Sequence, residues 1–297
     1  MRFLLHLSML CLFGGTAAAQ NSPVPRDPAL LEKIIGQGVP RELLTELVAF
    51  EAANLDREFL QSEYVCLGQE WSNPKPCAEK RRLGRDRTVR LHPHAAAVII
   101  DYSLPSDEKR FYLIHWDTGE VEKFFATHGS GSGTGRFATR FSNRKDSRQT
   151  SLGFYLAEGV YKGTYGKTLR MSGLEPANSR AYHRDIVLHG AWYASEAFLS
   201  RRNPRTGEAF GRLGLSWGCP ALSLAVAGRV IDSLKNGALI YHAHPGLIET
   251  ARRQRGEARG PDETPLPPRR PVDLPGDPQI PSIESSLPSS SSALTSE

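Results

Sequence analysis

Apolar side chains recur between residues 28 and 60 at the three- and four-residue spacing of an amphipathic helix. They are Leu30, Leu31, Ile34 and Ile35 in a first stretch, and Leu43, Leu44, Leu47 and Phe50 in a second. The segment from Gly36 to Pro40 breaks the pattern, and Pro40 is a residue that opens helices well. The pattern therefore predicts two consecutive helices over 28–60.

The pattern changes from about residue 95 to 190, where short apolar or alternating runs are separated by Gly, Ser, Asn and Asp. The runs read AAAVIIDYS, RFYLIHW, VEKFFATH, GFYLAEG, TLRMSG and DIVLHG. Runs of this length and spacing are typical of strands. Many short strands in succession favour a mainly β domain, a sandwich or barrel, over alternating strands and helices.

A helical pattern returns after Cys219. Val226, Val230 and Leu234 follow one another at four-residue spacing, with Ser223 as a candidate N-cap and Gly237 as a candidate end. The run ALIY at 238–241 predicts a last strand. We expect one helix between Cys219 and this strand.

The first residues have the layout of a secretory signal peptide. Arg2 precedes an apolar run from Phe3 to Phe13, and small residues from Thr16 to Ala19 follow. A short membrane anchor is the alternative, but the run is shorter than the roughly 20 residues that span a bilayer. The pattern predicts a signal peptide at 1–19 and export to the periplasm or cell envelope, and no other segment is apolar enough to cross a membrane.

The last residues, 251–297, are rich in Pro, Ser and Arg and end LPSSSSALTSE. Such a composition cannot bury a core, so we expect a disordered tail. Between the two ends, the sequence predicts a helical segment at 20–64 and the main domain at 65–250.

The balance of charges indicates an anionic partner. The formal net charge is +5 and the isoelectric point is near 9.1. The basic residues are scattered and no recognition helix or aromatic-basic motif accompanies them, which argues against nucleic acid. For an exported protein, a polyanionic polymer of the envelope is the more plausible partner.

Export also affects the interpretation of the four cysteines. Cys11 lies in the predicted signal peptide. Cys66 and Cys77 flank the loop LGQEWSNPKP and are candidates for a disulfide in an oxidising compartment, the alternative being two free thiols. Cys219 is then the unpaired cysteine and a candidate reactive thiol.

Two glycine-containing segments resemble nucleotide-binding loops without matching them. The run GSGSGTG at 129–135 lacks the third glycine of the dinucleotide motif, and Tyr161 stands where a P-loop ending in Gly166-Lys167-Thr168 needs glycine. Both are better interpreted as turns between strands.

Two His-x-His pairs, His92/His94 and His242/His244, are candidate metal ligands. No third ligand of matching context accompanies either pair. We expect no metal and no other cofactor.

The strongest candidate for chemistry is His189-Gly190 together with the stretch from Ser216 to Cys219. His189 ends the apolar run IVLHG, so its ring should project from a strand edge. Gly218 lets the backbone approach a substrate oxygen, and N–H groups of this turn can form an oxyanion hole. A thiol with a pKa near ~8.5 needs a neighbouring base, which His189 supplies. From the residues alone, a small buried cysteine and a satisfied strand histidine remain equally open.

At these residues the sequence resembles a known family. His-Gly followed downstream by Ser-x-Gly-Cys is similar to the signature of the L,D-transpeptidases, the YkuD-like catalytic domain of murein crosslinking. The ending SWGCPA resembles a murein subfamily, and the similarity covers roughly 95–245. The blocks that carry it, in order, are IIDYSLPSDEKRFYLIHWDTGEV, THGSGSG, ATRFSNRKDSRQTSLGFY, GLEPANSRAYHRDIVLHGAWY and GRLGLSWGCPAL.

The resemblance implies a YkuD-like β-sandwich or barrel at 65–250, with Cys219 as nucleophile and His189 as its activating base. It also implies that the Gly190 carbonyl orients the histidine and that Ser216, Gly218 and Cys219 shape the oxyanion hole. Trp217, Pro220 and Ala221 depart from the better-known pattern at the site. This makes Trp217 a candidate substrate-binding residue.

The implied reaction is acyl transfer on a peptidoglycan stem tetrapeptide. Cys219 would form a thioester at the third residue and release D-alanine, and a neighbouring stem amine would resolve it to a 3→3 crosslink. Arg184 is a candidate for binding stem carboxylates, or else a solvated strand-edge charge. The alternatives are hydrolysis of the same thioester and a non-catalytic murein-binding module. A papain-like amidase fits less well, because its cysteine normally precedes its histidine.

Overall fold

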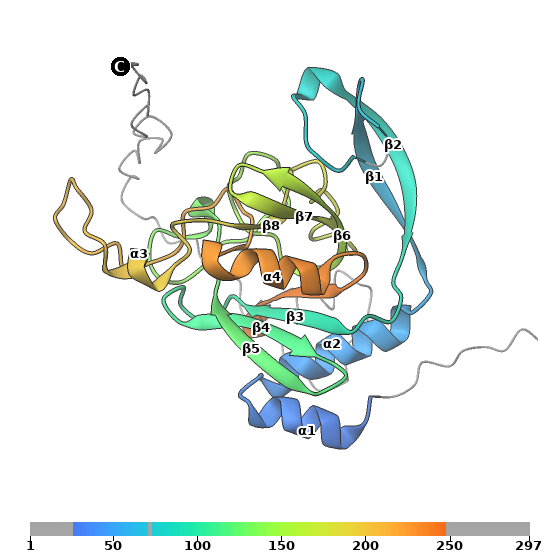
Figure 1. Cartoon of the computed structure of the whole chain (residues 1–297), viewed down its shortest axis with the longest axis horizontal. Coiled ribbons are helices and arrows are strands. Elements are labelled where there is room, and N and C mark those ends of the chain that lie inside the picture. Colours follow the sequence, from blue (N-terminus) through green and yellow to red (C-terminus); the bar gives the residue numbers. More distant parts are fainter. Residues whose placement is uncertain (1–25, 71–72, 248–297) are drawn as a thin grey trace, which may run out of the picture. The chain divides into compact units, whose positions relative to one another are not determined.

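Eight strands form one mixed sheet, in the spatial order β5-β4-β3-β10-β6-β7-β8-β9 (Figure 1). They are β3 (Ala96–Asp101), β4 (Lys109–His115), β5 (Glu120–Phe125), β6 (Gly153–Gly163), β7 (Gly166–Gly173), β8 (Val187–Gly190), β9 (Ala221–Leu222) and β10 (Leu239–Ala243). Neighbours are antiparallel except for β10 with β3 and β8 with β9, which are parallel. The prediction of a mainly β fold is confirmed, and every predicted strand overlaps an observed one.

The computed structural model describes residues 26–70 and 73–247, all within a unit formed by Met1–Ala258. The predicted signal peptide at 1–19 and the predicted tail at 251–297 lie outside the described residues. Within the described ranges, no helix has the length and apolar character needed to cross a membrane.

The two edge strands of the sheet approach one another. Thr127, just after β5, donates its N–H to the carbonyl oxygen of Ala221 in β9 at 3.1 Å. The Ala221 N–H in turn donates to the Thr127 hydroxyl oxygen at 2.9 Å. A bridge between Gly129 and Ser216 extends this seam. The sheet is therefore nearly closed, so that backbone groups of both edges find partners. Cys219 lies beside the seam.

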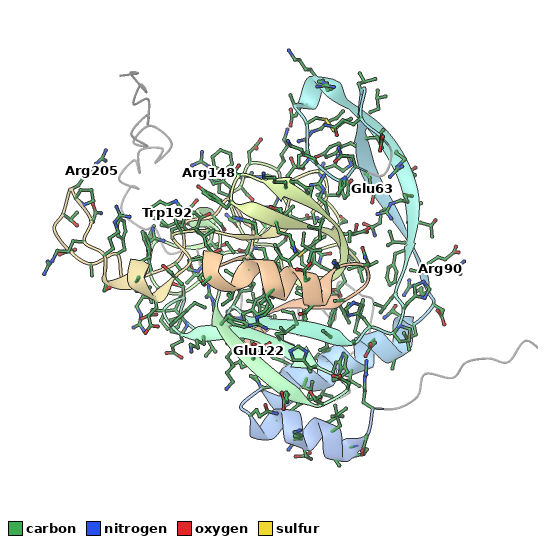
Figure 2. The ribbon with its side chains drawn as sticks, viewed as in Figure 1. Glu63, Arg90, Glu122, Arg148, Trp192 and Arg205 are labelled. Carbon is green, nitrogen blue, oxygen red and sulfur yellow. A yellow bond between two sulfur atoms is a disulfide. The ribbon has the colours of Figure 1, made fainter. Side chains whose placement is uncertain are left out.

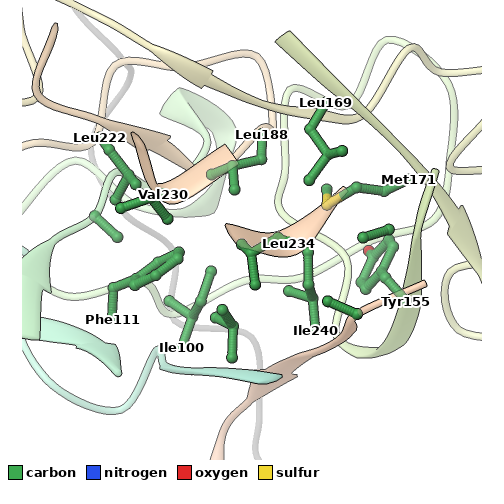
Figure 3. Close-up of a cluster of buried hydrophobic side chains, with 14 of the residues drawn as sticks. Ile100, Phe111, Tyr155, Leu169, Met171, Leu188, Leu222, Val230, Leu234 and Ile240 are labelled. Carbon is green, nitrogen blue, oxygen red and sulfur yellow. The ribbon is translucent and has the colours of Figure 1, made fainter. Parts of the chain in front are cut away.

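One face of the sheet packs against α4 (Leu224–Leu234), the helix predicted after Cys219. Val230 and Leu234 are fully buried against side chains of the strands (Figure 3). Ser223 stands at the N-cap position, although its side chain makes no capping hydrogen bond. The four-residue spacing therefore correctly identified the buried side of this helix.

The opposite face is covered by the N-terminal helices α1 (Pro28–Gly36) and α2 (Arg41–Asn54). Ile34, Leu43 and Leu47 are buried in a second cluster that includes side chains of β3, β4, β6 and β10. The helical prediction is wrong for the end of 28–60. α2 ends at Asn54 and a strand begins at Glu58, because side chains alternate between buried and exposed from there on.

That strand, β1 (Glu58–Cys66), pairs with β2 (Arg82–Arg90) in a separate antiparallel hairpin. Its alternating buried positions include the polar Gln61 and the charged Glu63, so the sequence shows no apolar alternation there. Glu63, labelled on the hairpin in Figure 2, is fully buried and pairs with Arg85 and Arg87. Arg87 also donates to Glu158 of β6 at 2.8 Å. The predicted boundary at 64/65 falls inside β1.

A disulfide joins Cys66 at the end of β1 to Cys77, the pair that the sequence suggested. It closes the loop between the two strands of the hairpin. The remaining helical turns are η1 (Glu79–Arg81), η2 (Ser130–Ser132), α3 (Glu196–Ser200) and η3 (Pro245–Leu247).

Candidate active site

The parallel pairing of β8 with β9 aligns the strand of His189 with the strand that follows the Cys219 turn. His189 lies opposite Ala221, two positions beyond Cys219, and Gly190 lies opposite Leu222. The two short paired strands therefore bring the segments of His189 and Cys219 together across the 29 residues that lie between them in the chain.

His189 is held in one tautomer. Its Nδ1 is 2.8 Å from the Gly190 carbonyl oxygen. Since a carbonyl only accepts, Nδ1 carries the proton in the neutral ring and Nε2 presents a lone pair. The Gly190 carbonyl thus makes the contact that the resemblance implied.

The turn that carries Cys219 requires glycine. Gly218 has a φ of +117°, and a Cβ at this position would lie 2.7 Å from the Gln149 carbonyl oxygen. Ser216 fixes the turn, because its buried hydroxyl donates to the Cys219 carbonyl oxygen at 2.7 Å and accepts the Gly218 N–H at 3.3 Å. In the described part of the chain, the Cys219 N–H has no hydrogen-bond partner.

The glycine-rich segment 129–133 packs against this turn. Ser130 donates its N–H to the Ser216 carbonyl at 2.7 Å. A Cβ on Gly129 would lie 2.2 Å from the Arg148 carbonyl oxygen and 3.0 Å from the Gly218 Cα. The segment is not a nucleotide loop: its glycines allow the chain to pack closely against the cysteine turn.

The resting thiol and imidazole are both neutral. Cys219 is half-buried, and burial raises the pKa of its thiol to about 11, against the lowering effect of the Val187 N–H and of Arg184 and Arg170. Burial lowers the pKa of His189 from 6.5, partly opposed by the Gly190 carbonyl. The thiol donates instead to the Asp185 carbonyl oxygen, with Sγ at 3.6 Å. At neutral pH the Cys219 thiol is therefore protonated and the His189 imidazole is unprotonated.

Arg184 has a different role from the predicted one. Its Nη1 donates to the Ser142 carbonyl at 2.8 Å and the Ser151 hydroxyl at 3.1 Å, and its Nη2 to the Gln149 carbonyl at 2.6 Å and the Ser147 hydroxyl at 3.4 Å. These four N–H bonds are all used within the protein. Arg184 therefore holds the 142–151 loop beside the cysteine turn, and it is not a free clamp for carboxylates.

Trp217 lies on the surface of the same turn, with 65% of its area exposed. The Arg148 guanidinium carbon is 4.7 Å from the centre of the indole ring, a cation–π distance, and Figure 2 shows Arg148 on the loops beside β7 and β8. The turn that carries Cys219 thus has an exposed aromatic side chain with a basic side chain packed over it.

The cluster around Asp185, whose carbonyl oxygen accepts the thiol, was not predicted from the sequence. The Asp185 carboxylate binds Arg82 at 2.5 Å and Arg170 at 2.8 Å and accepts the Tyr64 hydroxyl. Tyr64 and Arg82 belong to the hairpin, more than 100 residues earlier in the chain. No local pattern could have indicated this cluster, because only the tertiary fold brings its members together.

The candidate metal ligands take structural positions. His242 is buried and its Nδ1 is 3.0 Å from the Ser151 carbonyl oxygen, and burial lowers its pKa to about 4. His92 is exposed and pairs with Asp56 at 3.1 Å. Over residues 26–70 and 73–247, no three His, Cys, Asp or Glu side chains gather in a way that could hold a metal ion.

The protein combines a nearly closed mixed sheet, a histidine at the end of one strand and a cysteine on a glycine turn before the paired strand. These features define its class. The L,D-transpeptidase catalytic domain matches residues 80–243, more than half of the chain, and this stretch contains both residues. The chain belongs to this family, and the predicted YkuD-like fold class is confirmed. No curated protein sequence matches the chain.

Three solved structures of L,D-transpeptidases are similar to the chain. LdtMt1 in complex with imipenem is 15% identical with a TM-score of 0.30, and an L,D-transpeptidase from Mycobacterium smegmatis is 14% identical with a TM-score of 0.30. Each comparison covers 54% of this chain and 63% of the other. L,D-transpeptidase 1 from Mycobacterium tuberculosis is 14% identical with a TM-score of 0.27, covering 62% and 86%. These low values leave the assignment to rest on the family match.

Proposed function

We propose that the protein is an exported cysteine L,D-transpeptidase that acts on peptidoglycan stem tetrapeptides. Cys219 attacks the carbonyl carbon of the third residue, D-alanine leaves, and an amine of a neighbouring stem resolves the thioester to a 3→3 crosslink. The observation that carries the proposal is the β8–β9 register. In this register His189, whose tautomer is fixed, pairs with Ala221, two residues after the cysteine of the glycine turn, which supports a histidine–cysteine pair.

Proton transfer explains why His189 is needed. With a pKa of about 11, the thiol is almost wholly protonated at neutral pH, so attack requires a base at the moment of reaction. Because Nδ1 is bound to Gly190, Nε2 takes the thiol proton and then donates it to the departing amine of D-alanine. In the second half, Nε2 accepts a proton from the incoming amine and returns it to the sulfur as the thiolate leaves.

The developing oxyanion needs a donor that the resting protein does not use. The Gly218 N–H is turned to Ser216, whereas the Cys219 N–H is without a partner within the described residues. A free N–H at the nucleophile is the usual first donor of an oxyanion hole. We therefore assign this role to Cys219, with Ser216 and Gly218 fixing the turn that aims it.

Trp217 and Arg148 are suited to bind the substrate at the surface of the cysteine turn. The stacked pair offers an aromatic surface and a positive charge on the turn that carries Cys219. Stem peptides carry carboxylates, which a guanidinium binds well. This pair takes the place that the sequence had suggested for Arg184.

The test is incubation of the purified mature protein with disaccharide-tetrapeptide, followed by mass spectrometry of the products. We expect 3→3 dimers, free D-alanine and a transient adduct on Cys219. The matched control is Cys219→Ala with an unchanged near-ultraviolet circular dichroism spectrum, for which no product is expected. Unaltered turnover in that variant would overturn the mechanism. Tripeptide without dimers would identify a carboxypeptidase, and retention on sacculi without a carbapenem adduct would identify a binding module.

Export is proposed on the residue pattern at 1–19, and the disulfide between Cys66 and Cys77 suits an oxidising compartment. Cell fractionation with sequencing of the mature N-terminus tests it. We expect the protein in the periplasm or cell envelope, beginning at Gln20. A protein that stays with the cytoplasm and keeps Met1 would overturn the proposal.

A further inference from the structure

Asp185 lies directly behind the candidate nucleophile. Its carbonyl oxygen accepts the Cys219 thiol, with Sγ at 3.6 Å. Its backbone has a φ of +53°, in the left-handed region that side chains other than glycine rarely adopt. The acceptor of the thiol therefore sits in a backbone conformation that its surroundings must hold.

Three side chains from three strands hold the Asp185 carboxylate. Arg170 of β7 donates through Nη1 at 2.8 Å, Arg82 of β2 donates through Nη2 at 2.5 Å, and the Tyr64 hydroxyl of β1 donates to the same Oδ1 as Arg170. Arg170 also donates to the Tyr64 oxygen at 2.8 Å, so the four groups form one connected network. Charge-assisted bonds of this kind are strong and directional.

Two of these groups come from the hairpin, and Tyr64 lies outside the residues matched by the family. Arg82 is itself fixed, because its Nε donates to the carbonyl oxygen of Cys77 at 2.9 Å and its guanidinium stacks 4.0 Å from the Tyr64 ring centre. The disulfide at Cys77 thus anchors the end of the hairpin that reaches Asp185.

The network also controls charge near the sulfur. A bare carboxylate behind the thiol would oppose formation of the thiolate, whereas Arg82 and Arg170 offset that charge. Other titratable groups that act on or surround the sulfur are Arg184, His189, Tyr102, Tyr155, Tyr161 and Tyr193. Arg184 is a cation that is bound to the 142–151 loop, and the tyrosines are neutral at physiological pH. Among these described groups, Asp185 therefore supplies the negative charge that acts on Cys219.

We propose that Asp185 is a positioning residue for Cys219, and that the β1–β2 hairpin braces it through Tyr64 and Arg82. The hairpin then contributes to the site through Asp185. The role of Cys219 as a nucleophile rests on the proposed function. The effect of Asp185 on the reactivity of the Cys219 thiol does not depend on it.

The experiment measures the rate at which iodoacetamide alkylates Cys219, followed on the Cys219 peptide by mass spectrometry at pH values between about 7 and 9. In this range the rate follows the thiolate fraction, so one unit of pKa is tenfold in rate. We expect Arg82→Gln to slow alkylation by roughly 3- to 10-fold, and Asp185→Asn to speed it by a similar factor. Asparagine is chosen because it tolerates positive φ.

The controls separate this effect from damage to the fold. Arg90→Gln removes an exposed arginine of the same strand, which pairs with Glu58, and should leave the rate unchanged. Tyr64→Phe keeps the ring and should slow alkylation by roughly 2- to 3-fold. Unfolding would expose the thiol and accelerate alkylation in every variant, which is opposite to the result expected for Arg82→Gln and Tyr64→Phe.

Equal rates in wild type, Arg82→Gln and Asp185→Asn would overturn the proposal, and so would acceleration in both variants. Turnover of muropeptides is a separate measurement. If wild type makes no product while the alkylation rates keep the expected order, the proposed function fails and the positioning role stands. If product forms but the order is absent, only the positioning role fails.

Discussion

At the scale of single residues, the site depends on which atoms carry protons. The Gly190 carbonyl assigns the proton of His189 to Nδ1, and burial keeps both the imidazole and the Cys219 thiol uncharged. A neutral pair avoids the cost of a buried ion pair at rest, and in the proposed mechanism it forms charge only when Cys219 attacks the substrate. The site therefore differs from cysteine enzymes that store a thiolate–imidazolium pair.

This protonation state predicts the pH dependence of the reaction. His189 must be neutral to accept a proton, and its pKa is lowered from 6.5, so the neutral form persists to more acidic pH. We expect the acid limb of kcat/KM for D-alanine release to fall below pH 6.5. An acid limb well above that value would contradict the neutral pair. In the His189→Gln variant we expect the acid limb of the kcat/KM profile to be absent and the rate to fall by about 10²- to 10⁴-fold.

A second prediction concerns Gly218. Alanine at this position would place Cβ 2.7 Å from the Gln149 carbonyl oxygen and would have to hold a φ of +117°. We expect Gly218→Ala to distort the turn and lower acylation by about 10²- to 10³-fold, the loss typical of one oxyanion donor. Single-turnover mass spectrometry of the Cys219 adduct measures it. Gly228→Ala in α4 is the matched control, since its Cβ meets nothing within 4 Å, and it should keep full activity.

At the scale of elements, hydrophobic patterns in the sequence correctly predicted the strands and helices that have one apolar face. The strands that bury Ile100, Phe111 or Leu188 were predicted, as was the helix that buries Val230 and Leu234. The hairpin was missed because its inward face carries Glu63 and arginines that neutralise one another only after folding. A pattern of hydrophobicity cannot indicate such a face.

The hairpin leads to a prediction of stability. Its disulfide closes a loop with a sequence separation of 11, and a bridge of this size typically stabilises by about 2–3 kcal/mol. We expect the double variant Cys66→Ser/Cys77→Ser to lose about that much in the free energy of unfolding, measured in urea. Cys219→Ser, which breaks no bridge, should stay within about 0.5 kcal/mol of wild type. An unchanged midpoint in the double variant would show that the bridge contributes no stability.

At the scale of the whole molecule, charge favours a polyanionic surface as partner. The formal net charge is +5. Attraction of this kind weakens as salt shortens the Debye length from about 10 Å at 0.1 M to about 3 Å at 1 M. We expect retention of the inactive Cys219→Ala variant on isolated sacculi to fall steadily with added salt, measured by co-sedimentation. Salt-independent retention would instead indicate binding through the site alone.

The sequence by itself determined the local features of this protein: apolar periodicity gave the strands and α4, and the residues HG and SWGC indicated the site and the family. Only the tertiary structure decided how these features meet. The seam between Thr127 and Ala221, the β8–β9 register and the anchoring of Asp185 by Tyr64 and Arg82 all join segments that are distant in the chain. Hydrogen bonds and charges across such distances leave no local periodicity, because each partner is specified by the fold and not by its neighbours in sequence.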